Sequence, residues 1–393
     1  MGDGPERGHD AGIARFGRTG QASRRARLTV RGGARNLSRP GPATVAWLDE
    51  TEEIVTAALL LAWDLLLVGA PLAVVAFLAN AWRKEHAADR VPVLCYHRLT
   101  AVADLEAGRF KDDEPVWTVL DRDFEGQLDV LAAQGFETLD LDDVRAIRNG
   151  ERPAPARGIV LTFDDGYESV LRIAAPALQR RGMKAVVYAL LEPDEYTRTH
   201  VEGIDRICTH EEIVALQDHG LQIGSHSMTH AILTELPADK LRWEVEASRE
   251  QLGALIGRPI DHFCIPRGGV SQQVVDAVRA AGYWSCTGLA KGTARMSGDW
   301  LAAPRIAVER HHTPERFAKL LQPRHAFVHK VLGDLRLIPT RLLGAKRGKW
   351  LRGILYGPVL GWLFKPRNVK RFLALAVVLY GVAFAEMVLR RLA

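Results

Sequence analysis

Two adjacent carboxylates, Asp164 and Asp165, come directly after the apolar run GIVLTF. Two carboxylates this close repel one another unless a cation or a proton offsets their charge. Gly166 permits a sharp turn, which would let both side chains face one cavity. Such a pair could hold a metal ion with one carboxylate and keep the other as a general base for water.

Two histidines, His226 and His230, come directly after a second apolar run, LQIGS. Histidines spaced i and i+4 share one face of a helical turn and can close on one ion. One carboxylate and two imidazoles leave an open position on a metal for water, which is the pattern of a catalytic site rather than a structural one. Either cluster alone is a weak signal, and their joint placement after two apolar runs strengthens both.

The segments that would position these clusters alternate between strand-like and helical patterns from residue 91 onward. The apolar runs are nearly continuous, which is typical of strands covered on both faces, and stretches of helical period lie between them. This alternation predicts a parallel sheet, open or closed. In a closed barrel, chemistry takes place on the loops that follow the strands, where both clusters fall. The expected strands are 91–96, 158–163, 184–190, 221–225, 261–265, 283–287 and 305–308, and the expected helices are 124–133, 167–181, 211–218, 238–256, 272–281 and 314–321.

Composition places the chain among globular proteins with a large core. It has 393 residues, of which 47% are hydrophobic and 25% charged, with a net charge of +5. These values exclude a wholly disordered chain, a collagen and a mini-protein, and the near-zero mean hydropathy excludes a polytopic transporter. The four cysteines form no CxxC pair, which argues against a zinc knuckle or a disulfide scaffold. Cys95, Cys264 and Cys286 lie in strand-like runs and are interpreted as core packing.

Two apolar stretches predict membrane segments. Residues 54–82 contain one ionisable side chain, Asp64, and are long enough to span a bilayer. Pro71 could kink this segment or break it into a re-entrant hairpin. Residues 372–389 are expected to form a C-terminal transmembrane helix.

The flanking segments contain many basic residues, although residues 1–53 also hold seven acidic ones. Residues 1–53 hold nine arginines and no lysine and are expected to be a disordered tail. Residues 322–371 mix basic and aromatic side chains, which predicts a region lying on an anionic membrane surface rather than a nucleic-acid site. Charges next to the spans place residues 83–371 on the cytoplasmic side. The arginine-rich tail argues the opposite, so the side stays open.

The motifs TFDDG and SHSMTH, about sixty residues apart, closely resemble the first two motifs of the NodB-type polysaccharide deacetylases, carbohydrate esterase family four. The resemblance runs from Val91 to about Leu321 and includes VPVLCYHRL, the segment LRWEVEASREQLGALIG, and the stretch from FCIPRGG to AGY. It implies an α/β fold, a distorted (β/α)7 barrel, for a catalytic domain at residues 83–321. It also implies a divalent metal ion, usually zinc.

The same resemblance implies a role for each motif residue. Asp164 corresponds to the catalytic base, and Asp165, His226 and His230 correspond to the metal ligands. The implied reaction is hydrolysis of an N-acetyl group on a sugar, which yields acetate and a free amino sugar. In it the metal would polarise the amide carbonyl and Asp164 would activate the bound water.

The later family motifs match less well. In CIPRGG the arginine, Arg267, follows the proline, so its pairing with Asp164 is a hypothesis, and Arg305 is the rival for that role. The late Leu-x-His motif, which supplies the general acid in better-known members, has no clean counterpart. His97, in CYHRL, resembles the YH of membrane-linked and biofilm-polysaccharide deacetylases and is favoured over His312 as acid or substrate contact. Either histidine could instead only hydrogen-bond a loop.

Trp300, in SGDW, resembles a residue of a loop that lines the sugar site. Its ring could stack on a pyranose, or it could have only a packing role. Arg267, Trp300 and Arg305 are therefore the expected substrate-binding residues.

These observations together predict a membrane-bound, metal-dependent hydrolase, located at a bacterial inner or plasma membrane. It would remove the N-acetyl group from an amino sugar of a cell-envelope polysaccharide or a lipid-linked saccharide. One alternative keeps the chemistry but makes the enzyme a deformylase of a lipid-linked sugar. Another is a non-catalytic, membrane-bound glycan-binding or scaffold protein on a deacetylase fold.

Overall fold

The computed structural model describes residues 42–107, 115–195, 197–198, 205–357 and 366–392. The chain divides into two units, Met1–Trp63 and Asp64–Ala393. The second unit contains the strands and most of the helices.

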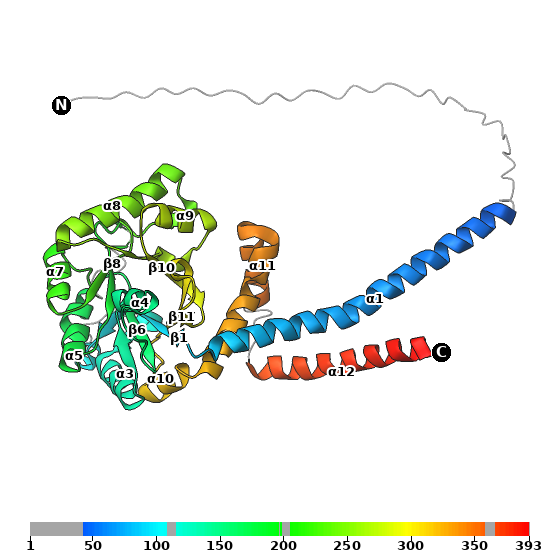
Figure 1. Cartoon of the computed structure of the whole chain (residues 1–393), viewed down its shortest axis with the longest axis horizontal. Coiled ribbons are helices and arrows are strands. Elements are labelled where there is room, and N and C mark those ends of the chain that lie inside the picture. The colour runs from blue at the N-terminus through cyan, green and yellow to red at the C-terminus, as the bar shows by residue number, and fades with distance from the viewer. Residues whose placement is uncertain (1–41, 108–114, 196, 199–204, 358–365, 393) are drawn as a thin grey trace, which may run out of the picture. The chain divides into compact units, whose positions relative to one another are not determined.

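Seven parallel strands close into a barrel (Figure 1). Their order around the ring is β2, β12, β10, β9, β8, β7 and β6, and β6 pairs again with β2 to close it. An eighth strand, β5 (Glu137–Leu139), pairs with β6 and lies outside the ring. The predicted distorted (β/α)7 barrel is confirmed. Its strands are β2 (Val93–Tyr96), β6 (Gly158–Phe163), β7 (Val186–Ala189), β8 (Gln222–Ser225), β9 (His262–Cys264), β10 (Ser285–Lys291) and β12 (Ala303–Ala307).

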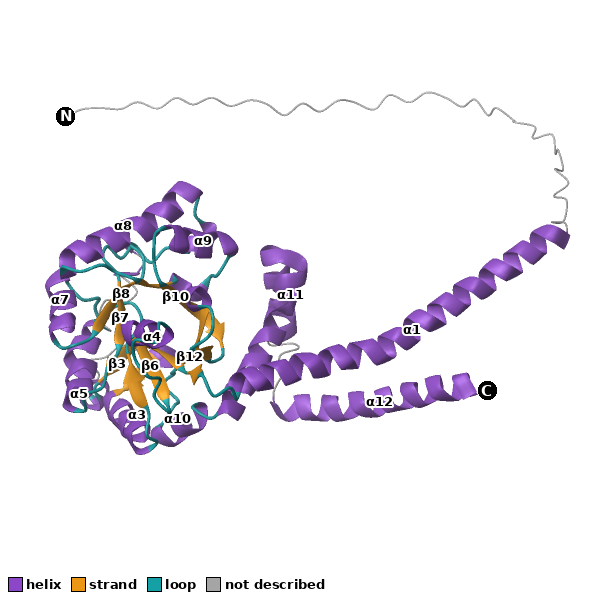
Figure 2. Ribbon diagram, viewed as in Figure 1, coloured by secondary structure: helices purple, strands orange, loops and turns teal. Residues whose placement is uncertain are grey.

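Burial explains why the strand-like runs were continuous rather than alternating. Every residue of β2, β6, β7, β8 and β9 is buried, since one face of each strand fills the barrel and the other lies under helices. Figure 2 shows these helices surrounding the strands. They are α3 (Asp121–Ala133), α5 (Ala175–Arg180), α7 (His210–Asp218), α8 (Ala238–Ile256), α9 (Gln272–Ala280) and α10 (Pro314–Leu320).

Several short elements were not predicted from the sequence. The helix expected over 167–181 begins with a π-helical turn, η2 (Val170–Ala174), before α5. Two small pairs of strands flank the barrel: β1 (Arg90–Val91) with β11 (Ala294–Arg295), and β3 (Arg98–Thr100) with β4 (Thr118–Leu120). The other additions are α2 (Val102–Glu106), α4 (Leu141–Arg148) and the 3-10 turns η1 (Pro115–Trp117), η3 (Leu233–Glu235), η4 (Pro266–Gly268) and η5 (Trp300–Ala302).

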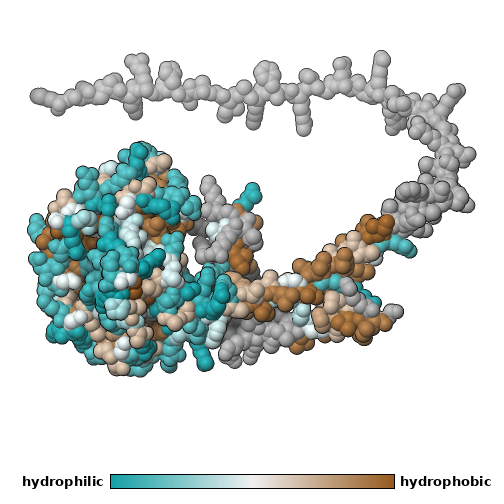
Figure 3. Space-filling view, viewed as in Figure 1, coloured by the Kyte–Doolittle hydropathy of each residue, from teal (hydrophilic) through white to brown (hydrophobic). Residues whose placement is uncertain are grey.

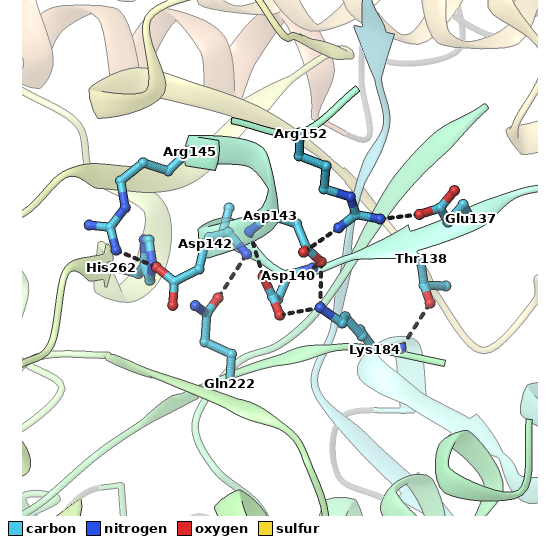
Figure 4. Close-up of polar contacts among 11 residues, drawn as sticks. Glu137, Thr138, Asp140, Asp142, Asp143, Arg145, Arg152, Lys184, Gln222 and His262 are labelled. Carbon is cyan, nitrogen blue, oxygen red and sulfur yellow. Dashed lines mark hydrogen bonds and ion pairs between the residues drawn. The ribbon is translucent and has the colours of Figure 1, made fainter. Parts of the chain in front are cut away.

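Helix α4 is tied to the end of the barrel at which the strands begin. The Leu141 amide donates to the side chain of Gln222, and the Asp142 carboxylate lies 3.2 Å from Nε2 of His262. Gln222 and His262 are the first residues of β8 and β9. Ion pairs complete this contact, joining Lys184 to Asp140 and Asp143, and Arg152 to Asp143 and Glu137 (Figure 4). Chemistry is therefore expected at the opposite end.

Helix α1 (Pro42–Glu85) corrects two expectations about the N-terminal region. It is continuous through Pro71, so the alternative of a re-entrant hairpin is wrong. It also begins before residue 54, so residues 42–53 are helical rather than part of a disordered tail; residues 1–41 lie outside the described ranges. Its part from Glu53 to Glu85 is long and apolar enough to cross a membrane, judged by length and composition. Figure 3 shows apolar side chains exposed along it.

The C-terminal region forms two further helices. Helix α11 (Pro323–Tyr356) occupies most of the basic stretch predicted over 322–371, and α12 (Pro366–Leu392) contains the stretch 372–389. Both segments are thus helical, whereas their contact with a membrane stays a prediction.

Candidate active site

Both polar clusters lie directly after barrel strands. Asp164 follows the last residue of β6, and His226 follows the last residue of β8. The chain turns sharply between Asp165 and Gly166, which both have a φ of 71°. A Cβ on Gly166 would lie only 3.3 Å from the Ala189 Cα. Glycine therefore suits this position for two reasons: it tolerates the positive φ, and it has no Cβ to make this close contact.

Asp165 and the two histidines converge on one point. The Nε2 atoms of His226 and His230 each lie 3.2 Å from Oδ1 of Asp165, and the three side chains form a group whose ligand atoms lie within 4.8 Å of one another. Asp165 and His226 are buried, and His230 is partly buried. One carboxylate and two imidazoles match the donors that bind zinc and similar divalent ions.

Contacts behind the histidines orient them for this role. Nδ1 of His226 lies 2.9 Å from the Cys264 carbonyl oxygen. A carbonyl oxygen can only accept, so Nδ1 carries a proton and Nε2 is the ring atom directed at Asp165. Nδ1 of His230 lies 3.3 Å from the hydroxyl of Thr197. Ligands of a metal are usually held in this way through their second ring nitrogen, so the residues present fit a divalent ion.

The turn that carries the histidines is not helical, so the expectation that His226 and His230 share one face of a helical turn is wrong. Residues 226–230 have no helical hydrogen bonding, and Ser227 and His230 have φ values of 74° and 70°. Left-handed backbone at residues other than glycine costs about 1–3 kcal/mol and often marks a functional site. An irregular turn, rather than one face of a helix, brings the two rings together.

Asp164 is held by Arg305 rather than by Arg267. Arg305 lies on β12, and its Nη1 and Nη2 donate to Oδ1 and Oδ2 of Asp164 at 2.6 and 2.7 Å. Burial alone would raise the pKa of Asp164, but the adjacent guanidinium outweighs it and lowers the pKa to about 2. Since Arg305 occupies both carboxylate oxygens, the hypothesised pairing with Arg267 is replaced. A substrate-binding role for Arg267, in turn η4, stays a prediction.

Of the two candidate acids, His97 lies close to Asp164. His97 follows β2, and its ring centroid lies 4.6 Å from that of Trp117. It also forms, with Cys95 and Asp164, a group whose potential ligand atoms lie within 4.8 Å of one another. Burial lowers the pKa of His97, and the nearby carboxylates only partly compensate. His97 therefore favours the neutral form in the free protein.

His312 is held in one tautomer. Its Nδ1 accepts a hydrogen bond from the Glu309 amide at 2.8 Å, so a neutral ring must carry its proton on Nε2. The residue is buried and lines a cavity of about 150 Å³ together with Cys95, Trp117 and Arg305. His312 therefore remains a candidate for contacting substrate.

Trp300 corrects the prediction of a sugar-stacking residue. Its side chain is only 2% exposed and belongs to a buried cluster that includes Val91, Leu139 and Ala303. Its ring stacks on that of Trp284, with centroids 6.1 Å apart. No face of the ring is open to a ligand, so packing is its role in this structure.

Sequence reasoning missed three residues of the site, two cysteines beside Asp164 and a tryptophan beside His97. The thiols of Cys95 and Cys264 lie 3.5 and 3.6 Å from its Oδ2, so these cysteines contact the site as well as filling the core. Both cysteines lie at or near the C-terminal end of a barrel strand. The expectation that chemistry lies where the strands end, which located the aspartates, would also have placed these cysteines at the site. Trp117, half-buried beside His97, follows no motif that could have revealed it.

Comparison with known proteins agrees with this geometry. Residues 151–285 match the family model for polysaccharide deacetylase. The chain carries a polysaccharide deacetylase domain of the NodB type. The matched range contains Asp164, Asp165, His226 and His230, whereas Arg305 lies beyond it.

Relatives of the polysaccharide deacetylase domain are distant in sequence. YxkH of Bacillus subtilis (strain 168), itself named a polysaccharide deacetylase only provisionally, is 22% identical over 229 residues, which cover 58% of this chain and 75% of that protein. The deacetylase PplD of Streptococcus pyogenes, solved with acetate, is 21% identical with a TM-score of 0.50, covering 60% of this chain and 99% of that chain. A de-N-acetylase from Aggregatibacter actinomycetemcomitans is 17% identical, also with a TM-score of 0.50, covering 59% and 99%. These structures support the barrel fold.

Proposed function

We propose that this deacetylase domain hydrolyses the N-acetyl group of an amino sugar in a cell-envelope polysaccharide or a lipid-linked saccharide, with a divalent metal ion, zinc, as cofactor. One observation carries the proposal. The buried carboxylate of Asp164 pairs with Arg305. The next residue in the chain, Asp165, contacts the imidazoles of both His226 and His230.

Asp165, His226 and His230 would hold the ion. When bound there, it would act as a Lewis acid toward the acyl oxygen of the substrate. Asp164 would have a different duty, because Arg305 keeps it ionised and fixes its orientation. An ionised carboxylate at this position can accept a proton from water as water attacks the acyl carbon.

The reaction also needs a proton for the leaving nitrogen. Water adds to the acyl carbon, Asp164 takes a proton, and the carbon–nitrogen bond breaks as the nitrogen gains a proton, which leaves acetate and a free amine. His97 is our first candidate for passing this proton on, because it lies beside Asp164. It is neutral in the free protein and would first have to take up a proton, which the charges of Asp164 and Asp165 favour. His312, which lines the same cavity as Cys95 and Arg305, is the second candidate.

The apolar part of helix α1 supports a location at a bacterial inner or plasma membrane. Its leucines and valines are largely exposed, for example Leu59 at 66% and Leu72 at 63%. An anchored enzyme would meet glycans built or attached at the bilayer surface. Fractionation of cells expressing the full chain checks this, and release of the protein by salt alone would contradict an embedded anchor.

The decisive test uses the full chain in detergent micelles. Bound metal per chain and acetate released from N-acetylglucosamine oligosaccharides are measured for the wild type, Asp164→Asn and the double variant His226→Ala with His230→Ala. We expect about one ion in the wild type and in Asp164→Asn, none in the double variant, and acetate release only by the wild type. His219→Ala, on the outer surface at the end of α7, is the matched control and should behave as the wild type.

Each failure has a distinct meaning. If metal is bound but neither acetate nor formate is released from acetylated or formylated sugars, a glycan-binding protein on a deacetylase scaffold is favoured. Release of formate alone would identify a deformylase. If Asp164→Asn retains full activity, the assignment of the base is wrong.

A further inference from the structure

The turn that carries both histidines is held by hydrogen bonds to several parts of the chain, and the Met228 and Thr229 carbonyl oxygens accept from the Glu192 and Asp194 amides. It runs from His226 to His230 without regular secondary structure and includes two residues with positive φ. Locally, the Ser227 amide donates to the Ser225 hydroxyl, and the His230 amide donates to the Ser227 hydroxyl, each at 3.2 Å. The amides between them, those of Met228 and Thr229, point elsewhere.

Those two amides are bound by a carboxylate from the neighbouring helix. Oε2 of Glu244, on α8, accepts hydrogen bonds from the amides of Met228 at 2.9 Å and of Thr229 at 3.0 Å. Its Oε1 accepts the hydroxyl hydrogen of Thr229. Glu244 is only 4% exposed, so these contacts replace its hydration. Hydrogen bonds to an ionised acceptor are about twice as strong as neutral ones.

The partners given for Glu244 in the described part of the chain are two backbone amides and one hydroxyl, all of them uncharged donors. A buried carboxylate without a counter-charge is costly unless several donors satisfy it. All three donors come from the segment between His226 and His230. The position of the carboxylate and the conformation of the turn are therefore determined together.

We propose that Glu244 is a positioning residue for the metal centre. By fixing Met228 and Thr229 it imposes the left-handed turn that brings the Nε2 atoms of His226 and His230 to the same oxygen of Asp165. It touches neither the ion nor the substrate, and its negative charge behind the turn favours a cation in front of it. This proposal rests on the proposed metal site.

The test compares Glu244→Gln with a destabilising control. Glutamine keeps the length and one carbonyl acceptor but loses the charge and the second acceptor. Leu252→Ala, two turns further along α8 at a fully buried position, should loosen the core without touching the turn. Metal affinity is measured on the folded full chain by competition with a chromogenic zinc chelator, and thermal unfolding is recorded for both variants.

We expect Glu244→Gln to weaken zinc affinity by about 10- to 100-fold, the usual effect of losing an outer partner of a ligand. Activity should fall at limiting zinc and recover in part at saturating zinc. Leu252→Ala should lower the melting temperature and leave the affinity of the folded protein unchanged. The proposal is overturned if Glu244→Gln binds zinc as the wild type does, or if Leu252→Ala weakens binding equally.

A second measurement separates this proposal from the proposed function. Hydrogen exchange of the Met228 and Thr229 amides is followed in the metal-free wild type and in Glu244→Gln. Faster exchange confined to the turn supports positioning even if the wild type binds no zinc, a result that would refute the proposed function alone. Equal exchange in the two proteins would refute the role of Glu244.

Discussion

Arg305 binds both oxygens of the Asp164 carboxylate, and the two side chains are 1% and 4% exposed. Paired guanidinium and carboxylate groups with this geometry combine charge with a fixed orientation. The pair thus sets both the protonation state of the candidate base and the direction in which it faces.

Replacing Arg305 should affect stability and activity in separable ways. Arg305→Met leaves a buried carboxylate without its partner, so we expect a loss of about 3–5 kcal/mol in the free energy of unfolding and about a 100-fold or greater fall in kcat. Urea unfolding and acetate release measure the two effects. Adding Asp164→Asn to Arg305→Met should restore part of the stability and none of the activity. A double variant no more stable than Arg305→Met would show that the ion pair is not the cause.

The two tryptophans should differ in what they affect. Trp300→Ala removes a buried ring, so we expect a loss of about 3–5 kcal/mol of stability with an unchanged KM. Trp117→Ala, at the half-buried ring beside His97, should raise KM about 2- to 10-fold, the range for a lost aromatic contact, with little change in melting temperature. Steady-state kinetics and thermal melts decide. A KM effect from Trp300→Ala alone would reverse the assignments.

The proton donor can be identified by changing the leaving group. His97→Ala should lower kcat for an acetylated amino sugar by about 100-fold or more, because the nitrogen must be protonated before it leaves. It should slow hydrolysis of 4-nitrophenyl acetate far less, because nitrophenolate leaves without a proton. His312→Ala should reduce both rates to a similar extent. The opposite pattern would make His312 the acid.

Asp205 should make stability depend on pH. Burial raises its pKa to about 7, well above the value of about 4 in an unfolded chain. Between these values the native state holds the proton that the unfolded state has lost, so stability falls as the pH rises from about 4 to about 7. Asp205→Asn can still accept the hydrogen bond from the Ser169 amide but cannot ionise. We expect it to match the wild type in melting temperature at pH 4 and to exceed it at pH 8. A difference independent of pH would contradict the raised pKa.

The barrel could be predicted from the sequence because its strands are buried on both faces. Runs such as GIVLTF stand out against the amphipathic helices, and the polar clusters follow them directly. Strand β5 was missed because it lies outside the ring and its exposed Glu137 interrupts the apolar run by which the barrel strands are recognised.

The site was predicted where its residues are adjacent in the chain, and less well where they are not. Asp164 and Asp165 follow one strand, and His226 and His230 share one turn. The partner of Asp164 lies 141 residues away on β12, and nothing local distinguishes Arg305 from Arg267. Trp300 was misjudged because local sequence does not reveal that Trp284 covers it. Only the closure of the barrel decides such contacts.

The connection between α1 and the barrel limits how far the catalytic end could travel. Helix α1 ends at Glu85 and β1 begins at Arg90, and the intervening residues 86–89 extend at most about 14 Å. The buried Glu85 carboxylate also accepts the Thr293 amide beside β11. With α1 anchored as proposed, residues 86–89 are too short a linker to let the domain move far from the membrane. It would act on newly made or lipid-linked chains at the bilayer surface and would not reach acetyl groups far from the membrane.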